Sequence, residues 1–179
     1  MNRILIFISA LVISACQPST WSIDKNGVGP INSATKLYEL SVLFPKDSLS
    51  ASEMKGDSLI GDIEIFQPGG QLKLIVSSND SNDPASAIAY IRVIDAKFKT
   101  KNNLGPESTF GEIKNIHKIQ SIDNAINSVV VSFKDTQWYI TIDKKELPEN
   151  IRYDYATKIE MSQIPNEAKV KYFIYPFSK

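Results

Sequence analysis

The sequence predicts an α+β fold that consists of an antiparallel sheet and a few short helices. Segments with alternating apolar and polar residues follow one another along the chain with no helix between them. That order favours antiparallel pairing over a doubly wound parallel sheet. Short stretches with apolar residues three to four positions apart precede each set of strands, which is typical of amphipathic helix. An apolar segment at the N-terminus lies outside this pattern.

The first helix and the first strands lie in the N-terminal half. Leucines at helical spacing in residues 35–44 predict a helix capped by Ser33 or Thr35 and ended by Pro45. Alternation then predicts three strands of one antiparallel sheet. They cover residues 59–67, 71–78 and 87–95, joined by a Pro-Gly-Gly turn at 68–70 and a polar loop at 79–84.

The second half repeats the order of helix and strands. Residues 108–116 predict a short helix with Ser108 or Thr109 as its cap. Strands are predicted at 126–133, 137–143 and 169–175. Two similar units, about 27–103 and 104–179, are one interpretation, although the shared pattern is too loose to establish a duplication.

The N-terminus has the organisation of a secretory signal peptide. Arg3 precedes ten nearly all apolar residues at 4–13. A helix of that length spans about 15 Å, half of a bilayer core, so it is too short to cross a membrane. Ser14 and Ala15 are small, as a signal peptidase requires before its cleavage site. We therefore expect residues 1–15 to be a signal peptide.

Cys16, the one cysteine of the chain, directly follows this segment. Residues 13–16 (Ile-Ser-Ala-Cys) resemble the bacterial lipobox, which implies a diacylglycerol on the Cys16 sulfur, cleavage before Cys16 and N-acylation. Such acylation anchors a protein stably. An ordinary secretory signal that ends in a free cysteine, or a buried structural cysteine, is the alternative.

The same resemblance implies a location for the mature protein. Gln17 stands where Asp would retain a lipoprotein in the inner membrane, so we expect the outer membrane, with the domain in the periplasm. Surface exposure stays open. Residues 16–26 are polar and are expected to tether the lipid to an α+β domain at 27–179.

Composition excludes several classes of partner and cofactor. Without Arg3, 19 basic residues remain against 20 acidic ones, so no charge excess points to nucleic acid. With Cys16 lipidated, no thiol is left for a disulfide or a thiolate metal site. We predict no cofactor and no metal.

The layout of the domain resembles the RpoE-regulated (sigma-E, envelope-stress) lipoprotein family of proteobacteria, a family defined by a domain of unknown function. The resemblance is carried by four segments: 27–29 with 35–37, the strand at 87–95, residues 105–113 and the strand at 169–175. It implies an envelope location and no particular activity.

Candidate catalytic and metal residues are few. His117, the one histidine, has no serine elbow or serine-lysine motif to accompany it, so an exposed or capping role is expected. Asp80 does not begin a calcium loop, because loop positions six and twelve are Ala85 and Ile91. Gly27 to Gly29 precedes the first expected strand, so we expect a turn there rather than a phosphate loop.

Two further groups have a structural and a functional interpretation. Asp57, Asp62 and Glu64 form a candidate carboxylate site, but alternation with isoleucines makes them the expected solvated side of a strand. Aromatic residues concentrate in 138–179, where we expect sheet core and edge, with a binding surface as the alternative. Lys144, Lys145 and the lysines at 169 and 171 are expected to be solvated.

The expected function is therefore non-enzymatic. We predict an outer-membrane lipoprotein with a binding, assembly or maintenance role in the envelope, attached to the membrane through Cys16 and partnered by an envelope protein. A periplasmic inhibitor of a lysozyme-type hydrolase is the alternative. A hydrolase is a third hypothesis, which requires a cleft that gathers Asp62, Glu64 and His117.

Overall fold

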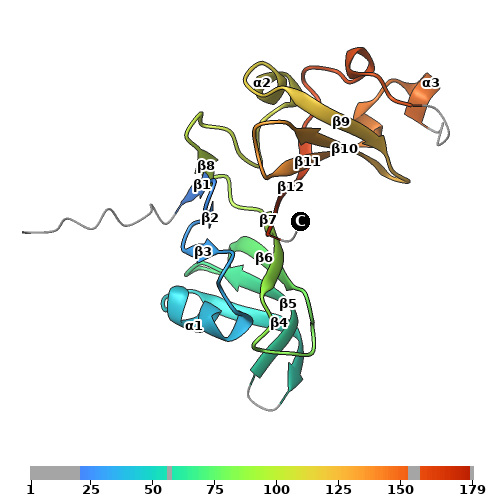
Figure 1. The fold of residues 1–179 in the computed structure, drawn as a ribbon. Helices are drawn as coiled ribbons and strands as arrows, with labels where there is room; N and C mark the ends of the chain where they lie inside the picture. The colour runs from blue at the N-terminus through green and yellow to red at the C-terminus, as the bar shows by residue number, and fades with distance from the viewer. Residues whose placement is uncertain (1–20, 56–57, 153–157, 178–179) are drawn as a thin grey trace, which may run out of the picture.

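The computed structural model describes residues 21–55, 58–152 and 158–177, and it confirms an α+β fold with two sheets (Figure 1). Neighbouring strands of the eight-stranded sheet are all antiparallel. In spatial order they are β4 (Ser48–Lys55), β5 (Ser58–Phe66), β6 (Leu72–Ser78), β7 (Ile88–Val93), β12 (Val170–Pro176), β11 (Tyr139–Asp143), β10 (Ser128–Phe133) and β9 (Ile119–Asn124).

A second, four-stranded sheet lies beside the first. Its order is β3 (Ile31–Asn32), β2 (Gly27–Val28), β1 (Ser22–Asp24) and β8 (Lys99–Thr100), and β1 pairs with β8 in parallel. The folded part thus begins before residue 27, because Ser22–Asp24, assigned above to the tether, forms β1. The edge of the Trp21 ring packs on Phe98, with 4.9 Å between ring centroids.

The helices are all short. They are η1 (Leu37–Glu39), α1 (Leu40–Leu43), α2 (Phe110–Lys114), η2 (Lys144–Glu146), α3 (Glu149–Arg152) and η3 (Met161–Gln163). The helices predicted at 35–44 and 108–116 are confirmed as η1 with α1 and as α2. Among the described residues, no helix has the length and apolar character needed to cross a membrane.

The two predicted helix starts have different outcomes. Thr109 caps α2, since its side chain accepts a hydrogen bond from Glu112 N while its own N–H donates to the Glu112 carboxylate. The prediction of Ser33 or Thr35 at the first helix is wrong, because η1 begins after Lys36, whose N–H donates to the Glu39 carboxylate at 2.8 Å.

The eight-stranded sheet consists of two four-stranded meanders, β4–β7 and β9–β12, each preceded by a short helix. Their last strands, β7 and β12, pair at the centre of the sheet, which we call the seam (Figure 1). The two units therefore share one sheet. The seam makes each half depend on the other for the pairing of its last strand.

Equivalent backbone hydrogen bonds recur in the two halves. In the first half Leu37 N donates to Ser86 O, and in the second Phe110 N donates to Ala168 O. Likewise a residue opening β7 donates to Thr35 O, and the residue opening β12 donates to Ser108 O. Each helix start is thus held in the same way to the start of its meander's last strand.

The strands that the sequence missed include both edges of the large sheet. β4 carries mostly small or polar residues, and it has a neighbour on one side alone. In β9, Ile119 and Ile122 are three residues apart, which breaks alternation. A register shift in the pairing with β10 lets both pack against the core.

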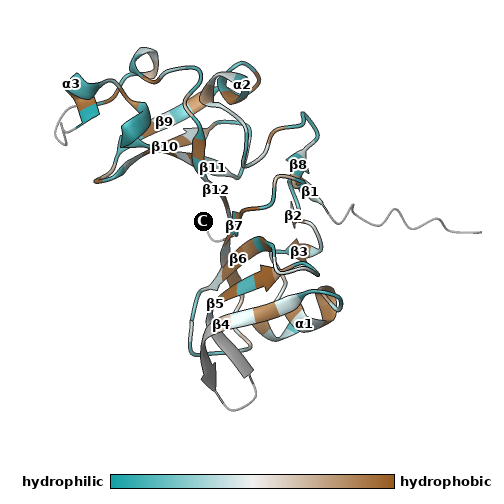
Figure 2. Cartoon of the chain, turned by 180° about the vertical axis from the view of Figure 1, so that it is seen from behind, coloured by the Kyte–Doolittle hydropathy of each residue, from teal (hydrophilic) through white to brown (hydrophobic). Residues whose placement is uncertain are grey.

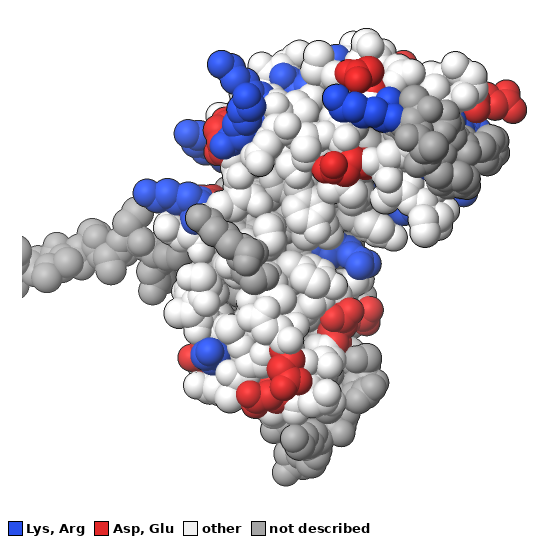
Figure 3. Space-filling view, turned by 45° about the vertical axis from the view of Figure 1, so that its right-hand side comes forward, with Lys and Arg blue, Asp and Glu red and all other residues white. Residues whose placement is uncertain are grey.

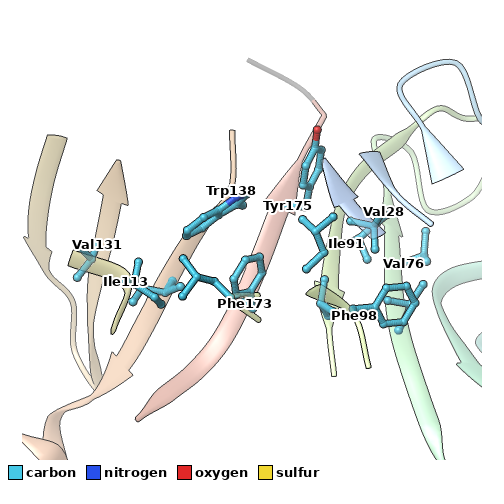
Figure 4. Close-up of a cluster of buried hydrophobic side chains, with 14 of the residues drawn as sticks. Val28, Val76, Ile91, Phe98, Ile113, Val131, Trp138, Phe173 and Tyr175 are labelled. Carbon is cyan, nitrogen blue, oxygen red and sulfur yellow. The ribbon is translucent and has the colours of Figure 1, made fainter. Parts of the chain in front are cut away.

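One core cluster extends over both halves and the small sheet (Figure 4). Figure 2 shows apolar residues concentrated on the strands and hydrophilic residues on most connections. The cross-strand register aligns a continuous buried row across six strands. From β5 to β10 it contains Ile65, Leu74, Val93, Phe173, Ile140 and Val131.

Gly27 in β2 is expected to tolerate no side chain. A Cβ atom there would lie 1.9 Å from the Ile31 carbonyl oxygen, which belongs to the adjacent backbone. We expect Gly27→Ala to lower the free energy of unfolding by at least about 2 kcal/mol in urea denaturation, because the small sheet must open. Gly70→Ala is the control: its φ of +84° also disfavours alanine, but a Cβ there meets no atom within 4 Å, so this variant is expected to cost only about 1 kcal/mol. An equal cost at both positions would contradict the steric argument.

Candidate functional site

A groove lies where the small sheet meets the turn between β10 and β11. It consists of two adjoining depressions of about 530 and 600 Å³. Lys25, Thr136 and Gln137 line both of them, so they form one continuous surface. Residues from β1, from the turn after β8, from the end of α2 and from the β10–β11 turn contribute to its wall. The groove is therefore built from segments that are distant in sequence.

His117 is the most buried polar group of the groove, with 9% of the residue exposed. It follows α2, and its N–H donates to Ile113 O, which continues the last helical turn. The ring lies edge-on to Trp138 at 5.1 Å and 6.1 Å from Phe133. Of the two roles expected for His117, exposed or capping, the exposed one is wrong, because these rings enclose the side chain while the preceding Ile116 is exposed.

His117 forms an ion-pair geometry with a residue that the sequence did not single out. Its Nδ1 lies 2.8 Å from Asp135 Oδ2. Since a carboxylate only accepts, Nδ1 carries the proton. The hydrogen bond from His117 lowers the pKa of Asp135, and the nearby charges of His117 and Lys101 act in the same direction. His117 Nε2 is buried and has no hydrogen-bond partner among the described residues.

No nucleophile joins this pair. The two threonines that line the His117 depression use their hydroxyls on the backbone: Thr100 Oγ1 accepts from Leu104 N, and Thr136 Oγ1 donates to Trp138 O. A histidine–aspartate pair needs an adjacent hydroxyl or thiol for covalent catalysis. The geometry fits binding, with Nε2 and the lysines as polar contacts and Trp138 as an apolar wall.

Lysines give the groove a positive character. Lys25, Lys101 and Lys134 line the His117 depression together with Asp24 and Asp135. Three lysines thus stand against two carboxylates among these lining residues, which leaves an excess of one positive charge. A ligand or partner surface with negative charge fits this arrangement. In the described part of the chain, no group of three or more His, Cys, Asp or Glu side chains has the arrangement of a metal site.

Gln137 is held in place from the core. The Tyr175 hydroxyl donates to Gln137 Oε1 at 2.6 Å, and Tyr175 is 1% exposed. Burial raises the pKa of Tyr175 to about 12, and the charge of Asp24 adds to the shift. Tyr175 thus connects the core at the seam to a residue that lines the groove.

The raised pKa of Tyr175 predicts a loss of stability at alkaline pH. The unfolded tyrosine ionises near pH 10, whereas the folded one ionises near 12. The folded state therefore binds more protons between these values, and the free energy of unfolding decreases as pH rises through them. Urea unfolding at pH 8 to 11 measures the slope, and Tyr175→Phe is expected to reduce it. An identical slope in that variant would contradict the assignment to Tyr175.

The carboxylates predicted as a candidate site do not meet His117. Asp62 and Glu64 lie on one face of β5, where Asp62 accepts a 2.6 Å hydrogen bond from Ser77. Four strands separate β5 from β10, and His117 packs on the core side of the sheet. The structure therefore does not form the cleft that the hydrolase hypothesis requires. Asp57 and Cys16, the residue predicted to carry the lipid, lie outside the described residues.

The C-terminal aromatic residues divide between two environments. Trp138, Phe173 and Tyr175 are buried in the core cluster, as expected. Tyr139 is half-buried and Tyr172 is 37% exposed, both on the opposite face. The expectation that Lys144 is solvated is wrong, because that residue is 5% exposed.

Comparisons with known proteins bear on the fold alone. No family model matches the chain, and no curated protein matches it. Among solved structures, the chain is similar to the crystal structure of the uncharacterized protein yfeY from Escherichia coli. The TM-score is 0.58 with 13% sequence identity, and the match covers 88% of this chain and 99% of that one. The fold is that of an α+β protein with mostly antiparallel sheets, and it is shared with that neighbour.

Proposed function

We propose that the protein is a lipid-anchored binding or assembly protein of the bacterial envelope, held in the outer membrane with its domain in the periplasm. The observation that carries the proposal is the segment at 13–16, which ends a signal-like apolar stretch in the lipobox pattern with Cys16. Acyl chains on that one residue suffice for stable anchoring.

The groove supports a binding role. It combines a buried histidine nitrogen without a partner, three lysines and a tryptophan wall, all positioned by separate segments of the chain. The threonine hydroxyls beside His117 are already used by the backbone. This set of groups suits recognition of an anionic surface of an envelope protein better than a covalent reaction.

Lipidation is tested by Cys16→Ser in cells fed radiolabelled palmitate, with membrane fractionation. We expect the native chain to take up label and sediment with outer membranes, and the variant to lose both properties. A variant that stays membrane-bound and processed like the native chain would overturn the anchor, and with it the proposed location.

The binding role is tested by crosslinking from membranes with matched lysine variants. Lys101→Glu reverses a charge in the groove, and Lys158→Glu does so at a side chain that is 78% exposed and does not line the groove. We expect one envelope partner to be captured by the native chain and Lys158→Glu, and lost with Lys101→Glu. Equal capture by both variants would overturn the groove as the site. Inhibition of a lysozyme-type hydrolase by the purified protein would favour the alternative function instead.

A further inference from the structure

The large sheet has a second face, opposite the core. Every buried apolar side chain of the described residues belongs to one core cluster except Ile174 in β12, which is 5% exposed and lies outside that cluster. Alternation along β12, between the core residues Phe173 and Tyr175, turns Ile174 to the other side. We call this side the outer face; its central residues are Ile75, Tyr90, Arg92, Tyr139, Thr141, Tyr172 and Ile174.

The cross-strand register gathers these residues around the seam. Arg92 in β7 lies between Ile75 in β6 and Ile174 in β12. Ile174 is in turn opposite Tyr139 in β11, and the neighbouring pair is Thr141 with Tyr172. Figure 3 shows that the surface where the two halves meet is indented and mostly uncharged.

Arg92 is the cation at the centre of the outer face, and it has no acidic partner among the described residues. Its guanidinium carbon lies 4.4 Å from the centroid of the Tyr172 ring. Its Nε is buried without a hydrogen-bond partner. Buried arginine donors are normally satisfied by a carboxylate, phosphate or carbonyl. Glu64 occupies the same register row two strands away, but its carboxylate forms no ion pair with Arg92.

A further polar group of the outer face, on β11 and opposite Tyr172, has no hydrogen-bond partner among the described residues. Thr141 is 8% exposed, and its Oγ1 has no hydrogen-bond partner in the described residues. Desolvation raises the pKa of Tyr139, and the adjacent Tyr90 adds to the rise while Arg92 opposes it. The Tyr139 hydroxyl is therefore a neutral donor at physiological pH. Aromatic rings around one stacked arginine are typical of binding surfaces.

We propose that the outer face binds a ligand with one carboxylate on an apolar or aromatic body, and that Arg92 holds the carboxylate through its guanidinium fork. Tyr172 orients the guanidinium by stacking, and the apolar body lies on the tyrosines and isoleucines of the seam. Arg92 is the cation of this face that has no acidic partner among the described residues, which matches a singly charged carboxylate. A phosphate dianion fits less well, because the second cation near Tyr172, Lys171 with its Nζ 5.6 Å from the ring centroid, is already paired with Asp143 at 2.8 Å. This site lies across the sheet from the groove and does not depend on it.

The arginine content of the chain gives the test an internal control. The sequence contains Arg3, Arg92 and Arg152. Arg152 Nε and Nη2 both donate to Leu147 O, at 3.3 and 2.9 Å, so its guanidinium is already engaged. The purified full chain therefore gives three arginine Nε ¹⁵N–¹H resonances, of which those of Arg92 and Arg152 are the informative ones. Arg92→Lys and Arg152→Lys assign the two signals.

The probes are benzoate, benzamide and inorganic phosphate. We expect benzoate to shift the Arg92 signal with a dissociation constant on the order of 1 mM, and to leave the Arg152 signal in place. Benzamide has the same shape without the charge and is expected to leave both signals unchanged. Equal shifts at both arginines, or none with benzoate, would overturn the site. A larger shift with phosphate at equal concentration would overturn the assignment to a carboxylate.

Arg92→Lys distinguishes the contribution of the planar guanidinium from that of its positive charge. Arg92→Lys keeps the positive charge but loses the planar donors. Tyrosine fluorescence is expected to show at least about fivefold weaker benzoate binding in Arg92→Lys, and unchanged binding in Arg152→Lys. Circular dichroism verifies that both variants are folded. Unweakened binding in folded Arg92→Lys would show that charge alone attracts the probe, which contradicts the proposal.

Discussion

Lys73→Met is expected to lower the free energy of unfolding by about 3–5 kcal/mol, because it leaves a buried carboxylate without its cation. Lys73 Nζ lies 2.7 Å from Asp47 Oδ2, and the two side chains are 4% and 9% exposed. The ammonium also lies 4.6 Å from the Trp21 ring centroid and 5.2 Å from that of Phe44. Methionine keeps roughly the length of the side chain, so the decrease in the free energy of unfolding reports removal of the positive charge. Urea denaturation measures it.

Two controls test whether burial of the ion pair causes the large loss of stability. The Lys171–Asp143 pair has a similar separation, 2.8 Å, but its side chains are 27% and 29% exposed. Lys171→Met is therefore expected to cost less than about 1 kcal/mol. The double variant Lys73→Met with Asp47→Leu is expected to recover most of the loss, since it removes both charges. A similar cost for both lysine variants would contradict the argument.

Phe173→Ala is expected to cost about 3–5 kcal/mol and to destabilise both halves together. Phe173 is fully buried at the seam, and its ring centroid lies 4.7 Å from that of Trp138. Its cross-strand neighbours are Val93 in the first half and Ile140 in the second. The cavity therefore opens where the two halves share their core.

Unfolding of Phe173→Ala is best followed by tryptophan fluorescence and far-ultraviolet circular dichroism in the same urea series. We expect both signals to shift to lower urea with one common midpoint. Tyr172→Ala, at the adjacent and 37% exposed position, is expected to cost less than about 1.5 kcal/mol. Separate midpoints for the two signals would show that the halves unfold independently.

The sequence predicted the interior strands of the large sheet, which have a neighbour on each side and bury one of their two faces in the core. β5, β6 and β7 alternate clearly, because their inward residues, such as Ile63, Leu74 and Val93, are all fully or nearly buried. The edge strand β4 does not require this pattern. In β9 the register shift moves the second isoleucine back to the core side, so a period of two does not describe it. The two-residue strands of the small sheet are too short to produce any period.

The candidate groove was predicted only through His117. Asp135 is one acidic residue in a polar hairpin turn, and no spacing rule connects it with a histidine 18 positions earlier. The pair exists because the end of α2 lies beside the β10–β11 turn, which is a tertiary contact. Arg92 occupies a polar position of an alternating strand, so the sequence could not distinguish it from a solvated residue. Its burial follows from the tyrosines that neighbouring strands place around it.

The central position of β12 has a consequence for how the chain acquires its fold. β12 follows every other strand in the sequence, yet it lies between β7 and β11. A nascent chain without residues 170–176 has two separate meanders, and each presents an unpaired inner edge. Such edges are sites of aggregation and of recognition by chaperones and proteases. We expect products truncated before β12 to be degraded, so that only chains that complete the seam persist.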